Sequence, residues 1–375
     1  MNSILRCLSV GILFLFFITC EKKNENNYTG TLLVDDIQAL VDSARNGDII
    51  QLPEGTITWE SSLRIDKGIT LNGAGTDKTI IINGSAESGK NVINVDGIEG
   101  VLFIIQNITF KGALGNSDDK ANVIYITGDC KDFRITNCKF VDGGSHSISI
   151  RGDTYGVIDH CQFINASQEC IVVFHSGKGD YSWSLGDMFG TANAVYIEDC
   201  YFNFNTKGDH AITSNNGARY VFRYNTINSA KELNASLIDA HGNFFADRGT
   251  YSVEIYENIL NTDRSWYGMN IRGGKGVIFN NTFSGDSPNP IVFASYRSFV
   301  ESDTTVCGYT ECDYPVKDQI NNFYVWNNTL NGDFIGVSMQ NRGLEAEHIQ
   351  QDRDYFLFEM PGYKAYPYPH PLIKE

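Results

Sequence analysis

The sequence predicts an all-β solenoid, in which short strands wind into stacked coils. One five-residue phrase recurs along most of the chain, as QNITF, TNCKF, DHCQF, EDCYF, RYNTI, YENIL, FNNTF and WNNTL, and its closest copies lie 23 residues apart. Gly is frequent, at 36 of 375 residues, and Pro is scarce, at 8, which fits many tight turns between short strands. A repeat of this kind indicates units that bury their apolar faces against their neighbours.

The first twenty residues have the pattern of an export signal. A basic start at Arg6 leads into an apolar stretch over residues 10–18, too short to span a membrane comfortably, and Cys20 follows it. This placement of Cys20 resembles the bacterial lipoprotein signal, in which that cysteine becomes the lipidated first residue. We therefore expect a signal over residues 1–20 and a polar tether over 21–30. The protein would be exported and anchored to the outer membrane by a lipid on Cys20.

A single amphipathic helix is predicted after the tether, over residues 35–45. Its apolar face holds Ile37, Leu40, Val41 and Ala44. Two alternating segments punctuated by Gly follow, over residues 47–55 and 69–75, and we expect both to contain strands.

The stretch from Ile37 to Ile82 contains GDIIQLPEGTITW, GITLNGAG and DKTIIING. It resembles the opening of the pectate-lyase-like superfamily of right-handed parallel β-helices, in which a short helix caps the first coil and protects the open sheet edge. The resemblance implies a right-handed parallel β-helix over residues 31–340, with residues 341–375 as a C-terminal extension packed on it. The superfamily contains lyases, hydrolases, epimerases and adhesins, so the resemblance is specific for fold.

The repeated phrase itself is interpreted as scaffold. The position two before its end changes along the chain from Cys138, Cys161 and Cys200 to Asn225, Asn258, Asn281 and Asn328. We expect the cysteines to pack inward and the asparagine amides to bond along the stack at a turn. Glu198 and Arg223 should be neighbours on consecutive coils and form a surface ion pair. Cys307 and Cys312, in a long loop, are a disulfide candidate in an exported protein.

A second strand precedes each phrase and carries polar residues on its outer side. Aligned on their Gly or Ser corners, these strands give one column of Arg151, His175, Ser214 or Asn215, His241, Arg272 and Ser295. A column two residues earlier holds Ser149, Val173, Ile212 or Thr213, Asp239, Asn270 and Phe293. Columns two apart on a strand face the same way, and adjacent strands lie about 4.8 Å apart. Two arginines and two histidines are therefore predicted to share one external face.

Long loops are predicted to flank this face as the walls of a groove. They cover residues 177–193, 243–250 and 296–321, and loops of such length in a compact solenoid are usually functional. Tyr181 and Trp183 are the candidates for stacking on a sugar. The other predicted substrate contacts are Arg151, His175, Asn215 and Arg248.

The histidines and arginines of the predicted face point to β-elimination on a uronate. The reaction removes the proton next to a carboxylate, so a base must take the proton while a cation neutralises the carboxylate. His241, oriented by Asp239, is the candidate base, and Arg272 and Arg151 are the candidate carboxylate clamps. Three residues are alternative acids or bases: Tyr256, Tyr267 and Lys275.

Two other functions stay open from sequence. Asp209 and Asp239 on adjacent coils would suit a glycoside hydrolase, and a non-catalytic, glycan-binding or adhesive solenoid would need neither. The motifs of polygalacturonase-like and alginate-lyase-like relatives are not matched. No cofactor is required, although calcium could bind through residues 116–119 or Asp209. The net charge of −16 disfavours nucleic acid as a partner and leaves an acidic polysaccharide in a locally basic groove, bound by a monomer.

Overall fold

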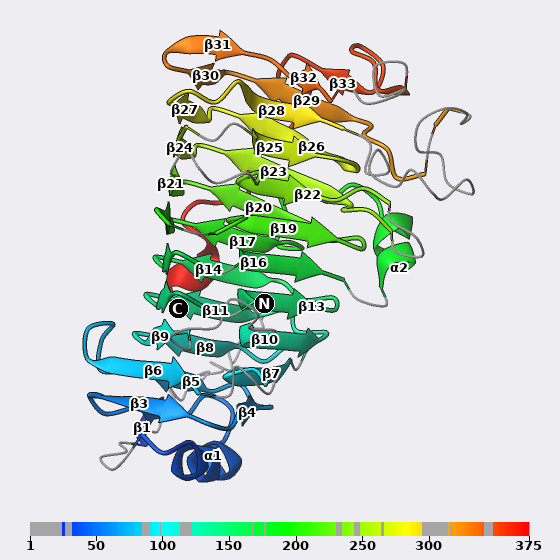
Figure 1. Ribbon diagram of the computed structural model, residues 1–375. Coiled ribbons are helices and arrows are strands. Elements are labelled where there is room, and N and C mark those ends of the chain that lie inside the picture. Colours follow the sequence, from blue (N-terminus) through cyan, green and yellow to red (C-terminus); the bar gives the residue numbers. More distant parts are fainter. Residues whose placement is uncertain are drawn as a thin grey trace, which may run out of the picture.

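The chain winds into a right-handed parallel β-helix, as predicted (Figure 1). Each coil contributes one strand in turn to sheet A, sheet B and sheet C, and strands of successive coils pair side by side. The structure, a computed structural model, describes residues 25–26, 32–84, 90–97, 99–112, 122–143, 145–166, 168–175, 178–206, 208–229, 235–243, 248–263, 266–294, 314–315, 317–340 and 348–374.

The strands are short and follow one another in stacking order. Sheet A contains β1 (Glu25–Asn26), β2 (Ile49–Gln51), β5 (Thr70–Asn72), β8 (Phe103–Gln106), β11 (Phe133–Thr136), β14 (Gly156–Asp159), β17 (Val195–Glu198), β20 (Arg219–Arg223), β23 (Ser252–Tyr256), β26 (Lys275–Phe279), β29 (Phe323–Trp326) and β33 (Tyr355–Phe356). Sheet B contains β3 (Gly55–Trp59), β6 (Thr79–Asn83), β9 (Thr109–Lys111), β12 (Lys139–Val141), β15 (Gln162–Ile164), β18 (Tyr201–Phe204), β21 (Thr226–Ser229), β24 (Ile259–Thr262), β27 (Thr282–Ser284), β30 (Asn328–Leu330) and β31 (Asp333–Ile335). Sheet C contains β4 (Leu63–Ile65), β7 (Ile93–Gly97), β10 (Asn122–Gly128), β13 (His146–Arg151), β16 (Glu169–Phe174), β19 (Ile212–Asn215), β22 (Ile238–Ala240), β25 (Tyr267–Ile271), β28 (Asn289–Phe293) and β32 (Ser338–Met339).

The predicted capping helix is present as α1 (Val34–Ser43), at the blue end of the stack in Figure 1. Its apolar face is buried, with Ile37 and Val41 fully covered, and it packs against β4 of the first coil. In the described part of the chain, α2 (Gly179–Ser184), between sheets C and A, and the 3₁₀ helix η3 (Pro371–Lys374) lie outside the stack. Among the described residues, no helix combines the length and apolarity needed to cross a membrane.

The repeated phrase forms the turn from sheet A to sheet B. Its second residue takes the left-handed conformation in every copy, for example at Asn137 (φ 48°), His160 (φ 53°) and Glu257 (φ 58°), so a single residue makes the bend. Asparagine tolerates this conformation better than most residues. The last residue of the phrase points inward, where Phe110, Phe140, Phe163 and Phe202 stack face to face.

The Cys and Asn column lies at this turn and is buried, as predicted. Cys138, Cys161 and Cys200 are free thiols in the core. The asparagine amides bond from coil to coil: Asn258 Nδ2 donates to Asn281 Oδ1 at 2.9 Å, and Asn281 Nδ2 donates to Asn328 Oδ1 at 2.8 Å. Cys20, Cys307 and Cys312 lie outside the described residues, so lipidation and the disulfide stay predictions.

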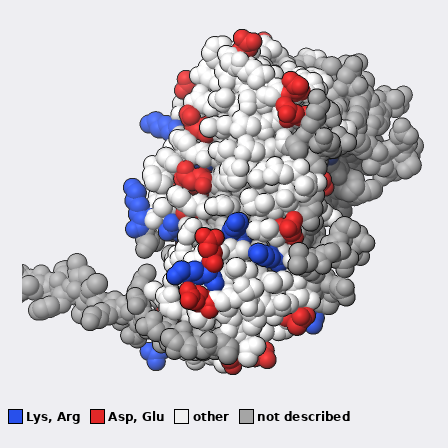
Figure 2. Space-filling model, turned by 60° about the vertical axis from the view of Figure 1, so that its left-hand side comes forward, with Lys and Arg blue, Asp and Glu red and all other residues white. Residues whose placement is uncertain are grey.

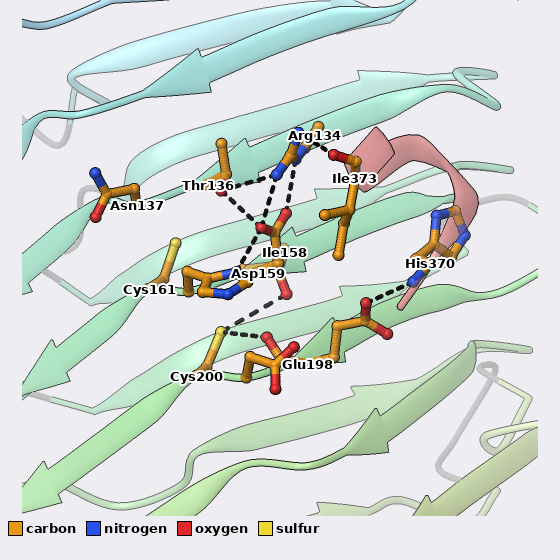
Figure 3. Close-up of polar contacts among 12 residues, drawn as sticks. Arg134, Thr136, Asn137, Ile158, Asp159, Cys161, Glu198, Cys200, His370 and Ile373 are labelled. Carbon is orange, nitrogen blue, oxygen red and sulfur yellow. Dashed lines mark hydrogen bonds and ion pairs between the residues drawn. The ribbon is translucent and has the colours of Figure 1, made fainter. Parts of the chain in front are cut away.

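The outer face of sheet A is covered by a C-terminal segment, residues 363–374, which runs back along the stack to β14 (Figure 1). Arg134 binds Asp159 at 2.9 Å and donates to the carbonyl of Ile373, while the backbone N–H of His370 donates to Glu198 at 2.8 Å (Figure 3). The segment therefore closes this face with backbone hydrogen bonds to charged side chains.

The prediction of a surface ion pair between Glu198 and Arg223 is wrong in one respect. The two residues are neighbours on β17 and β20, and Arg223 Nε donates to Glu198 Oε2 at 2.7 Å. Both side chains are 0% exposed, however, because the C-terminal segment covers them. Arg223 also donates to the carbonyls of Tyr366 and Pro367, so the buried charge is satisfied on several sides.

Charged side chains are spread thinly over the visible surface. In the view of Figure 2 most of the described face is uncharged, and its basic and acidic groups lie intermixed. The excess of acidic residues thus does not gather into one block on this face. A candidate site therefore has to be sought in the local geometry of the coils.

Candidate functional site

The outer face of sheet C brings three predicted site residues together. Asp239 lies mid-strand in β22, between the core residues Ile238 and Ala240, so its side chain points outward. His241 follows at the end of the same strand. Arg272 follows β25, one coil further on, where its backbone N–H donates to the carbonyl of Ala240 at 2.9 Å. We call Asp239, His241, Arg272 and the neighbouring His210 the Asp239 cluster.

Arg272 and Asp239 form a two-pronged ion pair. Arg272 Nε donates to Asp239 Oδ1 at 2.9 Å, and Nη2 donates to Oδ2. The side chains are 10% and 5% exposed. Burial by itself raises the pKa of Asp239, but the positive charge of Arg272 and the contact with His241 outweigh it and hold that pKa well below its usual range. Asp239 is therefore a fixed negative charge that orients its neighbours.

His241 meets this carboxylate through one ring nitrogen. Its Nε2 lies 3.3 Å from Asp239 Oδ2, and the side chain is 22% exposed. Burial lowers the pKa of His241, the charge of Asp239 opposes that shift, and the charge of Arg272 adds to it. The ring is neutral at neutral pH with its proton on the nitrogen that faces Asp239, so the lone pair resides on Nδ1. A neutral imidazole held by a carboxylate is suited to accept a proton.

His210 completes the cluster, and sequence reasoning missed it. The residue lies two positions before β19, and its Nε2 lies 3.9 Å from Asp239 Oδ2 on the next coil. Its Nδ1 lies 2.6 Å from the carbonyl oxygen of Ser236. The sequence analysis selects its neighbour Asp209 instead, whose side chain is exposed and lies before the strand. A shift of one residue in the expected register would have selected His210.

Three buried oxygens close to Asp239 have no hydrogen-bond partner among the described residues. They are Oγ1 of Thr213, Oδ1 of Asn215 and Oδ1 of Asn270. Thr213 and Asn270 are the direct neighbours of Asp239 on the preceding and following coils. Buried polar atoms are normally paired, so these three oxygens form an unsatisfied polar strip beside Asp239.

Strand pairing settles the register of residues 211–216 and corrects one column. Asp239 pairs with Thr213, and Asn215 pairs with Phe174, which in turn pairs with Arg151. The prediction that His175 shares the column of Arg151 is wrong, because Phe174 takes that place. The strand that leads to His175 is one residue longer before its corner than the other strands. Aligning it on that corner therefore shifts each of its residues by one position. The column two residues earlier therefore holds Val172 and Val292, not Val173 and Phe293.

His175 is instead buried at the corner between sheets C and A. Its side chain is 1% exposed, and its ring lies against that of Tyr155, with centroids 5.7 Å apart. Burial lowers the pKa of His175 to about 4. The residue is a neutral core histidine in this structure and not part of the outward face.

Arg151 is on the predicted face but distant from the Asp239 cluster. Four strand spacings of about 4.8 Å separate it from Arg272, roughly 19 Å in all. Its guanidinium lies 4.1 Å from the ring centroid of Phe174, and Nε donates to Ser149 Oγ at 3.1 Å. The two arginines cannot hold the same carboxylate, so Arg151 would have to contact another sugar of a polymer.

The loop residues divide into one exposed and two anchored side chains. Tyr181, on α2, is 51% exposed. Trp183 Nε1 donates to the carbonyl of Gly249 at 2.9 Å, and the guanidinium of Arg248 covers the indole at 4.7 Å. Arg248 binds Asp318 through Nε and Nη2 and Asp180 through Nη1. Trp183 and Arg248 thus fasten α2 to the stack.

The alternative acids and bases separate in space. Tyr256 and Lys275 belong to sheet A, where Tyr256 OH accepts from Arg223 and Lys275 binds Asp187 at 2.8 Å. Tyr267 begins β25 on sheet C, and its hydroxyl accepts from Gln340 Nε2 at 3.3 Å. Residues 116–119, the calcium candidates, lie outside the described residues. Within the described part of the chain, no group of three or more metal-binding side chains occurs.

Comparison with known proteins shows the fold. No protein-family model matches the chain. Among solved structures, the A-module of a mannuronan C-5 epimerase from Azotobacter vinelandii is similar, with a TM-score of 0.55 and 16% identity over 83% of this chain and 86% of that one. An alginate lyase from Paenibacillus is similar with a TM-score of 0.46 and 17% identity, over 69% of this chain and 95% of that one.

Among curated proteins, the chain is similar to the pre-neck appendage protein of Bacillus phage B103. The two are 25% identical over 232 residues, which cover 60% of this chain and 24% of the phage protein. The match thus spans about a quarter of that relative's length. This likeness, like the structural ones, leaves the reaction to be argued from the Asp239 cluster.

Proposed function

We propose that this protein is a polysaccharide lyase that cleaves a uronate-containing polysaccharide by β-elimination. The observation that carries the proposal is the Asp239 cluster, in which a neutral imidazole and an arginine share one carboxylate on a partly open face. Elimination needs a base for the proton at C5 of the uronate and positive charge for the carboxylate beside it. His241 and Arg272 supply the two.

Each residue has a distinct role in this proposal. Asp239 holds the His241 ring through Nε2, so that Nδ1 accepts the C5 proton. The same carboxylate fixes Arg272 through Nε and Nη2. The N–H groups of Nη1 take no part in that pair, and we assign them to the substrate carboxylate. Thr213, Asn215 and Asn270 would accept hydrogen bonds from sugar hydroxyls.

The cluster favours elimination over glycoside hydrolysis. A hydrolase of the usual kind needs one carboxylic acid that stays protonated and a second carboxylate across the scissile bond. The positive charge of Arg272 and the contact with His241 lower the pKa of Asp239 in spite of its burial, so this carboxylate is ionised at neutral pH and has no proton to donate. Asp209 is exposed, and His210 faces Asp239 in its place.

Epimerisation at C5 is the second candidate. It begins with removal of the same proton, and a second imidazole, His210, stands on the other side of Asp239 from the coil of Arg272. The fold is shared with an enzyme named for C-5 epimerisation of mannuronan. The two reactions differ in their products, which makes them separable by one experiment.

That experiment is incubation with polymannuronate, polyguluronate, polygalacturonate and a glycosaminoglycan in deuterated water. Ultraviolet absorbance of an unsaturated uronate, with new reducing ends, supports the lyase. Deuterium at C5 without chain cleavage supports the epimerase. Reducing ends without absorbance would support the hydrolase, and binding without either reaction would support an adhesive solenoid.

We further propose that the protein is exported and anchored through Cys20, as its first twenty residues suggest. Cys20→Ser should prevent incorporation of labelled palmitate and move the protein from the membrane fraction to the soluble one. Unchanged fractionation of the variant would contradict the anchor.

A further inference from the structure

His210 is held between two hydrogen-bond acceptors. Its Nδ1 lies 2.6 Å from the carbonyl oxygen of Ser236, an atom that can only accept, so Nδ1 must carry a hydrogen. Its Nε2 lies 3.9 Å from Asp239 Oδ2. A neutral ring with its hydrogen on Nδ1 would direct the lone pair of Nε2 at a carboxylate. A proton on Nε2 would instead place an N–H toward Asp239.

A second carboxylate lies on the other side of His210. Glu169 is on β16, the preceding coil, where the backbone N–H of Cys170 donates to the carbonyl of His210 at 2.9 Å. Burial by itself raises the pKa of Glu169, but His146, 3.1 Å from its Oε2, and the charge of His210 outweigh it and lower that pKa. His210 thus lies between two carboxylates, one on the coil before it and one on the coil after it, and Arg272 and His241 lie on the far side of Asp239.

His241 also contacts Asp239, and its surroundings favour the neutral form of the ring. Burial favours its neutral form, and the arginine beside it opposes a second positive charge. The Nε2 atoms of the two rings lie no more than about 7 Å apart, because both approach the same oxygen of Asp239. The face therefore presents two imidazoles within the span of one sugar linkage, and the His241 ring is the neutral one.

We propose that His210 is the proton donor of the reaction, acting as the acid while His241 acts as the base; this inference rests on the proposed function. His241 removes the C5 proton, and the electron pair of that bond forms the double bond between C4 and C5. The bond from C4 to O4 breaks, and O4 takes the proton of His210. His241 ends charged and His210 neutral, and exchange with solvent restores both.

The first test does not depend on turnover. In ¹H–¹⁵N spectra of the ring nitrogens at neutral pH, assigned with His210→Asn and His241→Asn, His210 should show the two protonated nitrogens of an imidazolium and His241 those of a neutral ring. A neutral His210 at neutral pH overturns the proposal.

The second test is kinetic. His210→Asn keeps an N–H group near the carbonyl of Ser236 but cannot donate a proton from Nε2, so kcat on polymer should fall about 10²–10⁴-fold, and the fall in rate at high pH should disappear. A synthetic uronate with a nitrophenyl leaving group at C4 needs no acid, and the variant should cleave it at nearly the wild-type rate. An equal loss on both substrates, with an unchanged pH profile, would mean that His210 is only structural.

The outcomes separate this inference from the proposed function. If no uronate polymer is cleaved by the wild-type protein, the lyase proposal fails, and the spectra still decide the charge of His210. If the wild type cleaves and His210→Asn cleaves polymer equally well, the lyase stands and the donor assignment falls. His160→Asn is the matched control, since His160 binds a carboxylate, Asp159, on sheet A and is 57% exposed.

Discussion

Two outer faces of the same coils carry a carboxylate bound by an arginine one coil later, and they differ in what surrounds the pair. On sheet A, Glu198 and Arg223 are sealed by the C-terminal segment and bonded to its backbone. On sheet C, Asp239 and Arg272 are slightly exposed and flanked by two imidazoles. An ion pair on a β-helix is therefore not a sign of chemistry by itself. Exposure and titratable neighbours make the difference.

The largest effect should come from removing the base on sheet C. We expect His241→Ala to lower kcat/KM about 10²–10⁴-fold, because Nδ1 no longer accepts the C5 proton. Urea unfolding should show little change in stability, since the side chain is partly exposed. His160→Ala, on sheet A, is the control and should keep full activity. A comparable loss of activity in both variants would contradict the assignment of the active site to sheet C.

Removing one partner of the buried Glu198–Arg223 pair should lower stability and leave activity unchanged. Glu198→Gln leaves the Arg223 charge buried without its carboxylate, and the free energy of unfolding should fall by about 3–5 kcal/mol. The kcat of the folded fraction should stay at the wild-type value. The exposed pair Arg64–Asp96 provides the comparison, since Asp96→Asn should cost about 0–1 kcal/mol. A fall in kcat without a loss of stability would place sheet A in the mechanism.

His175, at the corner between the two faces, should make stability depend on pH. The unfolded ring binds a proton near pH 6.5, whereas burial lowers the pKa of the folded ring to about 4. The unfolded state therefore binds more protons between these values, and the free energy of unfolding should fall by about 3 kcal/mol as the pH drops through that window. His175→Phe should flatten this part of the stability profile, and an unchanged profile would contradict the burial of the ring.

The smallest effect should come from the asparagine ladder, which lies between sheets A and B. Asn258→Ala removes the donor to Asn281 and the acceptor for the backbone N–H of Asn225. Leaving such buried groups unpaired should cost about 1–3 kcal/mol, measured by thermal or urea unfolding. Activity should not change at temperatures where the variant is folded. Ser284→Ala, on the exposed side of sheet B, should be nearly neutral.

The fold was predictable from sequence and the site only in part, for a physical reason. The turn from sheet A to sheet B needs a left-handed residue and a buried amide or thiol at fixed places, so Asn137 and Asn258 repeat visibly. The corner after sheet C has no such constraint. The position of this corner varies by one residue between coils. It is the same for the strands of Asp239, His241 and Arg272, which were placed together correctly, and different for the strand of His175, which was misplaced.

His210 and the C-terminal segment were missed for a related reason. His210 lies outside its strand and reaches Asp239 across coils, a contact that no local spacing encodes. The residues of sheet A that face outward read as a solvated surface, because the segment that buries Glu198 and Arg223 lies more than 100 residues away along the chain. Contacts between residues so far apart along the chain become visible only in the three-dimensional structure.

The most direct test of the central claim is a crystal structure of His241→Ala with a uronate oligosaccharide. The account predicts the sugar on the outer face of sheet C, its carboxylate at Arg272, its C5 toward the place of the missing imidazole, and its O4 toward His210. A sugar bound on another face, or with its carboxylate away from Arg272, would contradict the assignment of the Asp239 cluster as the active site.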